Sequence, residues 1–166
     1  MSFDQLQSPR SVVDPAGYNA TVIGPNNELD FLTHGNHNLV TPSSYSTTSL
    51  TGVMLGAGVY MTGLKSGIFR VIATLMPSNN TAGDGFAAQI RVGTGVAPAQ
   101  GAALAGSPGG EQLSGTSPAA NQPLPLTLID IFSNNVGTVL WVDLGVNALT
   151  GGTATFANVQ ILVEEL

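Results

Sequence analysis

Alternation of apolar and polar residues in two neighbouring stretches, 68–76 and 86–92, is the feature that most limits how this chain can fold. In both stretches every second residue is apolar, and residues such as Arg70 and Gln89 stand between them. A period of two is that of a β-strand with one buried face. Residues 77–85, Pro-Ser-Asn-Asn-Thr-Ala-Gly-Asp-Gly, can continue neither a helix nor a central strand. The sequence therefore predicts a β-hairpin over residues 68–92.

Other parts of the chain repeat the strand pattern. Residues 49–55, 58–64, 138–144 and 154–166 show it, whereas residues 126–132 are almost continuously apolar, as in a strand covered on both sides. Apolar spacing of three and four residues, which would indicate a helix, is never sustained. The sequence predicts an all-β fold, a sandwich or barrel of about eight antiparallel strands.

Two segments lack the strand pattern. Residues 1–45 are rich in proline and asparagine, contain both histidines and hold only short apolar pieces. This composition predicts an extended N-terminal arm in front of a domain formed by residues 46–166. Residues 96–125 are rich in glycine, proline and alanine, which predicts a long loop that contacts a partner.

The charge content argues against several classes of partner. Only 8% of the 166 residues are charged, the formal net charge is −6, and no two of the four basic residues are adjacent. Nucleic acid and anionic membrane surfaces require clustered Lys and Arg, so we expect neither as a partner. No apolar run is long enough for a membrane helix, and the chain has no cysteine. A weakly charged surface favours association between subunits.

Residues 91–106 contain the pattern Arg-x-Gly-Thr-Gly-x-Ala-Pro-Ala-x-Gly directly after a predicted strand. This segment resembles one found in virion structural proteins of tailed bacteriophages. Its surroundings, Gly-x-Tyr-x-Thr-Gly-Leu at residues 58–64 and a last strand ending in Ile-Leu-Val-Glu-Glu-Leu, resemble the C1q/TNF-like jelly roll of trimeric phage decoration and fibre proteins. The resemblance covers about residues 50–166 and implies a jelly-roll protomer that forms a homotrimer.

Within this jelly roll the alternation predicts which side chains face the core. They are Phe69, Val71, Leu75, Phe86, Ile90, Val92, Leu140, Val142, Val159 and Ile161.

The resemblance implies a capsid decoration (cement) protein, made in the host cytoplasm and located on the capsid surface of the virion. Its partners would be the major capsid protein of the same virion and two further copies of this chain. The alternative is the receptor- or glycan-binding tip of a head or tail fibre. The chain has no coiled-coil heptads or shaft repeats of the kind that a fibre stalk requires, which favours the decoration protein.

Candidate partner-binding residues follow from the predicted strands and from the arm. Residues beside a sheet edge are candidates for the trimer interface, and apolar residues of the arm are candidates for contact with the capsid. These residues are Tyr60, Arg70, Trp141 and Gln160 on strands, and Phe3, Leu6, Val12 and Val13 in the arm.

Patterns that would indicate chemistry are few, and we expect neither an enzyme nor a cofactor. His34 and His37 beside Asp30 could begin a metal site, but the Gly and Asn between them favour a polar loop. Asp130 and Asp143 lie in consecutive predicted strands and could pair for acid–base catalysis or glycoside cleavage, although ordinary solvent-facing or hydrogen-bonded aspartates are favoured.

Aromatic residues on the predicted strands offer one further possibility. Tyr60, Trp141 and Phe156 could form a platform that stacks on a sugar, although aromatic residues on strands belong more often to the core.

Overall fold

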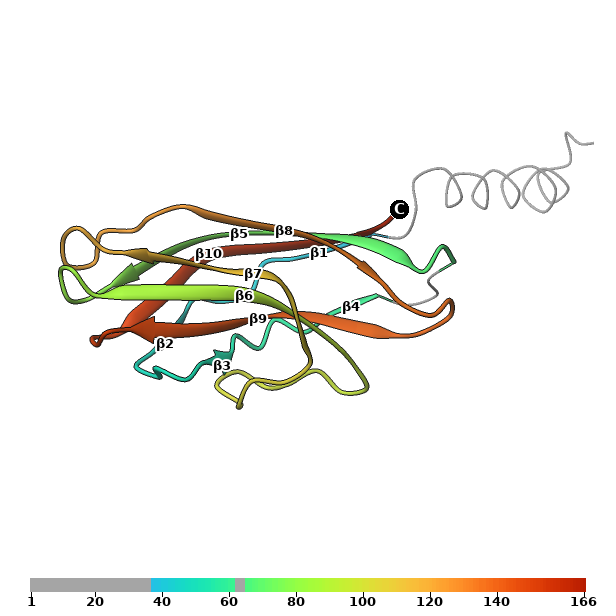
Figure 1. Ribbon diagram of the computed structural model, residues 1–166, viewed down its shortest axis with the longest axis horizontal. Coiled ribbons are helices and arrows are strands. Elements are labelled where there is room, and N and C mark those ends of the chain that lie inside the picture. The colour runs from blue at the N-terminus through green and yellow to red at the C-terminus, as the bar shows by residue number, and fades with distance from the viewer. Residues whose placement is uncertain (1–36, 62–64) are drawn as a thin grey trace, which may run out of the picture. The chain divides into compact units, whose positions relative to one another are not determined.

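The computed structural model describes residues 37–61 and 65–166, and within these residues it has ten strands and no helix. The strands form two antiparallel five-stranded sheets (Figure 1). Their bounds are β1 His37–Val40, β2 Tyr45–Thr47, β3 Val53–Met54, β4 Val59–Met61, β5 Ile68–Asn79, β6 Gly85–Thr94, β7 Ser107–Thr116, β8 Leu126–Ser133, β9 Leu140–Leu149 and β10 Ala154–Glu165.

The strand order is that of a jelly roll. The first sheet has the order β1-β10-β5-β8, with β2 pairing the start of β10, and the second sheet has the order β3-β9-β6-β7, with β4 pairing β9. The chain changes sheet between β2 and β3, returns at β5, and crosses again at most later connections, as two interlocked Greek keys require. The predicted all-β jelly-roll sandwich is therefore confirmed.

The core lies between the two sheets, and the sequence prediction of its members is confirmed. Every residue that the alternation assigned to the core is buried, from Phe69 at 0% exposure to Val92 at 9%. Phe69 of the first sheet, Phe86 of the second and Phe156 of the first are among the largest fully buried side chains. Side chains from the inner faces of the two sheets thus fill one apolar layer.

The predicted hairpin over residues 68–92 is wrong, although both of its strands exist. β5 pairs with β10 and β8 in the first sheet, whereas β6 pairs with β9 and β7 in the second. The short link between them crosses from one sheet to the other. Alternation shows which face of a strand is buried but not which strand lies beside it, and facing strands of a sandwich alternate in the same way as paired ones.

The predicted long loop at residues 96–125 contains β7, which the sequence analysis missed. This strand reads Ser-Pro-Gly-Gly-Glu-Gln-Leu-Ser-Gly-Thr and shows no apolar alternation. It lies at the edge of the second sheet and so has a neighbouring strand on one side only. An edge strand tolerates a proline such as Pro108, which has no N–H group to donate to a second neighbour. At Gly109 a Cβ atom would stand 1.8 Å from the ring of Phe132, so only glycine fits there.

The apolar run at residues 126–132 was expected to be covered on both sides, and this prediction is also wrong. The run forms β8, an edge strand whose Ile129 and Ile131 are 62% and 59% exposed. Packing within the described residues therefore does not account for the apolar character of its outward face.

The first sheet begins earlier than the predicted boundary between residues 45 and 46. β1 pairs with β10 from His37 opposite Glu164 to Val40 opposite Ile161, so residues 37–40 of the predicted arm are part of the sandwich. The rest of the predicted arm, residues 1–36, lies outside the described residues, and the arm stays a prediction there. No helix in the described part of the chain is long and apolar enough to cross a membrane.

One buried polar residue, Asn79 at the end of β5, joins the loops at one end of the sandwich. Its Nδ2 donates to the carbonyl oxygens of Gly85 and Gly151, at 3.0 Å each, and its Oδ1 accepts a hydrogen bond from the backbone N–H of Thr81 at 3.0 Å. The backbone N–H of Asn79 donates to Oγ of Ser117 at 2.7 Å. The side chain is 0% exposed, and the bonds to Gly85 and Ser117 are buried, so water does not compete with these two.

Replacing Asn79 by alanine should therefore lower the free energy of unfolding by roughly 3 kcal/mol, because two carbonyl oxygens and one N–H group lose their partner in a buried place. Urea unfolding followed by circular dichroism measures the change. Asn135→Ala, at an exposed turn position, is the matched control and should change the free energy by less than about 0.5 kcal/mol. Equal effects of the two substitutions would contradict this role of Asn79.

Candidate functional site

The outward side of the first sheet carries a row of aliphatic side chains in register across four strands. Leu39 of β1 stands opposite Leu162 of β10, Leu162 opposite Ile72 of β5, and Ile72 opposite Ile129 of β8. Leu39 is 57% exposed and Ile129 62% exposed. Because paired residues on one face of a sheet are neighbours, these four side chains form a continuous apolar band.

Further exposed aliphatic residues extend this band along the sheet. Ile131 follows on β8, and Ile68 and Leu166 lie side by side where the backbone N–H of Leu166 donates to the carbonyl of Ile68 at 2.9 Å. Their exposures are 59%, 45% and 54%. We call the whole surface the outer apolar face. It consists of Leu39, Ile68, Ile72, Ile129, Ile131, Leu162 and Leu166.

The charges on this face neutralise each other. Arg70 of β5 and Glu164 of β10 are cross-strand partners, and Nε of Arg70 donates to Oε2 of Glu164 at 2.7 Å, with Nη2 contacting the same oxygen. An antiparallel sheet normally turns polar residues to the solvent on the side away from its core. A sheet that is apolar on both sides, with its central charges paired, is instead typical of a surface that another protein covers.

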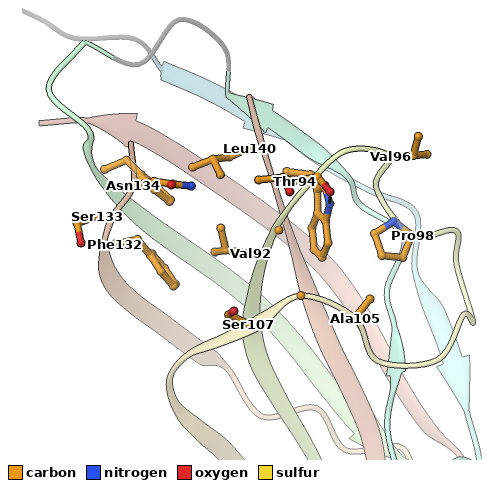
Figure 2. A pocket seen from close by; sticks show the side chains of 14 residues that line it. Val92, Thr94, Val96, Pro98, Ala105, Ser107, Phe132, Ser133, Asn134 and Leu140 are labelled. Carbon is orange, nitrogen blue, oxygen red and sulfur yellow. Dashed lines mark hydrogen bonds between the residues drawn. The ribbon is translucent and has the colours of Figure 1, made fainter. Parts of the chain in front are cut away.

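A cleft opens at one end of the sandwich, between the start of β7 and the end of β8 (Figure 2). Its volume is about 640 Å³. On one side the rings of Phe69 and Phe132 stack with their centroids 5.2 Å apart, and Asn134 lies beside them. Val96 and Pro98 lie on the opposite side in Figure 2. None of the lining residues is charged, so the cleft offers apolar contact and a few hydroxyl and amide groups.

Trp141 borders this cleft but presents little of its ring to the solvent. It is 3% exposed, and its Nε1 donates to the carbonyl oxygen of Thr94 at 3.1 Å. A Cβ atom at Gly93 would stand 2.3 Å from the ring, and one at Gly106 would stand 2.5 Å from it. The two glycines therefore make the space that the indole fills. Trp141 is held in place as part of the protein and is not available for stacking on a ligand.

The three aromatic residues do not form a platform for a sugar. Tyr60 of β4 is the cross-strand partner of Trp141 and is 41% exposed, with its hydroxyl oxygen accepting a hydrogen bond from the N–H of Ala97 at 2.8 Å. Phe156, by contrast, lies in the core at 0% exposure. The favoured interpretation, that aromatic residues on these strands are buried, is confirmed for Trp141 and Phe156 and is wrong for Tyr60.

The predicted partner-binding residues fall on two different sides of the sandwich. Arg70 and Gln160 lie on the outward side of the first sheet, beside the outer apolar face, whereas Tyr60 and Trp141 lie on the outward side of the second. One flat interface cannot include all four. Phe3, Leu6, Val12 and Val13 lie outside the described residues. The sequence analysis missed the aliphatic residues of the outer apolar face, although the run at 126–132 contains two of them.

Asp130 and Asp143 do not form a carboxylate pair, because they belong to different sheets, and the favoured interpretation as hydrogen-bonded aspartates is confirmed. Asp130 lies on β8 and Asp143 on β9. Oδ2 of Asp143 accepts a hydrogen bond from the N–H of Gly56, and Oδ1 accepts from the N–H groups of Ala57 and Leu144, at distances of 2.7–3.0 Å. Asp143 thus fixes the segment between β3 and β4 against the outside of the second sheet.

The metal site suggested by the histidines cannot be placed. His37 begins β1, and Asp30 and His34 lie outside the described residues. Among the residues that the structure describes, no three His, Cys, Asp or Glu side chains come together as a metal site would require.

No family model and no curated protein matches the chain in sequence. Similar solved structures include the Eiger TNF of S. frugiperda, with 9% identity over 78% of this chain and 90% of that chain and a TM-score of 0.47. The PRD1 vertex protein P5 shares 17% identity over 80% of this chain and 98% of that chain, with a TM-score of 0.38. An infectious bursal disease virus structure shares 11% identity over 80% of this chain and 38% of that chain, with a TM-score of 0.41. None of these likenesses assigns a function.

Asp143 gives a testable pH dependence. Burial raises the pKa of its carboxyl above the ordinary 3.8, against the lowering effect of its three backbone hydrogen bonds. A raised pKa means that the folded state binds this proton more tightly than the unfolded state, so the contribution of Asp143 to stability falls as the pH rises above 3.8.

We therefore expect Asp143→Asn to lower the free energy of unfolding by about 1–3 kcal/mol, because one backbone N–H would face the amide NH₂ group. The deficit relative to the wild type should be larger at pH 4 than at pH 7, as measured by urea unfolding at both values. A deficit that grows from pH 4 to pH 7 would show that the carboxyl pKa is lowered in the folded state.

Proposed function

We propose that this chain is a virion structural protein that acts as a homotrimeric capsid decoration (cement) protein. The observation that carries the proposal is the outer apolar face, together with the phage-protein resemblance of residues 91–106. Such a role needs no catalysis and no cofactor. It needs surfaces that associate and a fold that stays rigid while they do so.

Association of identical copies accounts for the outer apolar face. Burial of each half-exposed Ile or Leu side chain stabilises an interface by about 1 kcal/mol. Because Arg70 and Glu164 already neutralise each other, the face carries no net charge that would oppose its burial against a neighbouring copy. A closed ring of three copies would cover this face on every subunit and leave no unpaired surface for further growth.

The trimer would then bind the major capsid protein on the outside of the head. A decoration protein acts by adding buried surface across the boundaries between coat subunits, and several weak contacts from one trimer combine into strong attachment. Residues 1–36 precede β1, which pairs with β10 near the edge of the first sheet, so these residues are the proposed arm that reaches the coat.

Imaging of virions labelled for this protein tests the location. A regular label over the head supports the decoration protein. Label at the ends of fibres would support a receptor- or glycan-binding fibre tip and overturn the proposal.

The double substitution Ile129→Asp/Ile131→Asp should convert the trimer into monomers. Both side chains are more than half exposed on an edge strand, so their replacement leaves the core of the protomer unchanged. Light scattering coupled to size exclusion should give three times the chain mass of 16.9 kDa for the wild type and a single chain mass for the variant.

Val96→Asp is the matched control for this substitution. Val96 is 90% exposed and lies in the segment after β6, away from the outer apolar face, so the variant should stay trimeric. A wild-type protein that is monomeric at micromolar concentration contradicts the homotrimer. A double variant that remains trimeric would show that another surface forms the interface.

Deletion of residues 2–35 should leave a folded trimer that attaches more weakly to capsids. The cut ends before β1, because a deletion through residue 40 would remove a strand that pairs with β10. Binding of the truncated and complete chains to undecorated capsids is compared by co-sedimentation. Full occupancy by the truncated chain, or an insoluble product, would contradict the role of these residues as an arm.

A further inference from the structure

The outward side of the second sheet has a polar hollow that the decoration role does not use. Its volume is about 280 Å³. The floor is formed by β6 and β9 through Arg91, Gln89 and Gly145, and the rim includes Leu50 and Leu104 from loops that cover this side of the sheet. The hollow is separate from the outer apolar face, because it belongs to the other sheet.

Arg91 is the charged group of this hollow. Its side chain lies across Gly145, where a Cβ atom would stand 3.2 Å from Nε of Arg91, and Leu104 crowds the same position at 2.7 Å. Nε is buried and has no hydrogen-bond partner in the described part of the chain. A buried donor without a partner is costly and uncommon, so its presence in a hollow calls for an explanation.

The nearest acidic residue does not neutralise Arg91. Asp143 is its cross-strand partner on β9, but the carboxylate oxygens accept hydrogen bonds from the backbone N–H groups of Gly56, Ala57 and Leu144. In the described residues no ion pair joins Arg91 to Asp143. The guanidinium group therefore keeps its capacity to bind a carboxylate from outside the chain.

Amide groups around Arg91 supply hydrogen-bond acceptors. Nε2 of Gln89 donates to the carbonyl of Gly110 at 3.0 Å, and Nε2 of Gln112 donates to Oδ1 of Asn147 at 3.1 Å. Each amide nitrogen thus uses one of its two N–H groups, and the amide oxygens of Gln89 and Gln112 accept no hydrogen bond within the described residues. The hollow combines one cation with acceptors for O–H donors.

We propose that this hollow binds a sugar that carries a carboxylate, as in an acidic polysaccharide. The carboxylate would bind the guanidinium of Arg91, and ring hydroxyls would donate to the amide oxygens of Gln89 and Gln112. Leu50 and Leu104 would contact the C–H groups of the ring. An acidic sugar carries its hydroxyls at fixed positions beside the carboxylate, whereas an acidic side chain of a protein needs O–H or N–H donors from neighbouring residues, so the acceptors favour the acidic sugar. This site is independent of capsid binding.

Titration of the complete, ¹⁵N-labelled protein with sodium glucuronate, followed by NMR, tests the proposal. We expect saturable shifts at the amide signals of Gln89, Gln112 and Gly145, with a dissociation constant on the order of 1 mM. Glucose is the neutral control, and acetate is the control that has a carboxylate without a sugar ring. Each should bind at least about tenfold more weakly than glucuronate, a difference of about 1.4 kcal/mol in binding free energy.

Two variants and one control locate the site. Arg91→Gln and Leu50→Glu should each weaken glucuronate binding at least about tenfold, the first by removing the cation and the second by placing a like charge at the exposed rim. Leu50→Glu changes a surface residue, so it remains informative if Arg91→Gln does not fold. Lys65→Gln, which removes one positive charge elsewhere, should bind as the wild type does.

Three results would overturn the proposal. The first is the absence of a saturable shift with glucuronate. The second is equal binding of glucuronate and acetate, which would indicate a carboxylate side chain of a protein as the ligand. The third is unchanged glucuronate binding by both Leu50→Glu and a folded Arg91→Gln.

Discussion

A sandwich of two sheets has two outward sides, and within the described residues loops cover only that of the second sheet. β9 is buried along almost its whole length, and Asp143 holds the segment between β3 and β4 beside it through hydrogen bonds from the N–H groups of Gly56 and Ala57. No described segment lies over Ile72 and Ile129 on the outside of the first sheet. This asymmetry leaves the outer apolar face exposed within the described part of the chain.

The inward faces of the strands could be predicted from the sequence, but their neighbours could not. Alternation placed Phe69 and Phe86 in the core, because a period of two directly reports which side of a strand is buried. It could not show that the strands of these two residues belong to different sheets. β7 was missed for the opposite reason, since an edge strand built from Ser, Pro and Gly around the ring of Phe132 needs no alternation at all.

The candidate surfaces differ in how far the sequence could predict them. The run at residues 126–132 signalled an unusual strand, but its Ile129 and Ile131 were assigned to a covered strand because apolar residues look the same in a core and in an interface. The hollow around Arg91 depends on Gly145, which the pairing of β6 with β9 brings beside Arg91, and on Leu104, which follows the bridge between Ala103 and Val53. No local pattern could have revealed it.

Trp141 is an intrinsic fluorescence probe of this protein. It is the single tryptophan of the chain, and it lies buried between Gly93 and Gly106 with its indole N–H bonded to Thr94. Its fluorescence therefore reports on the second sheet alone and changes when that sheet loses its packing. If copies of the chain associate through the first sheet, as proposed, their separation would leave this environment intact. Emission from one natural residue would then distinguish dissociation of such an assembly from unfolding of its protomers.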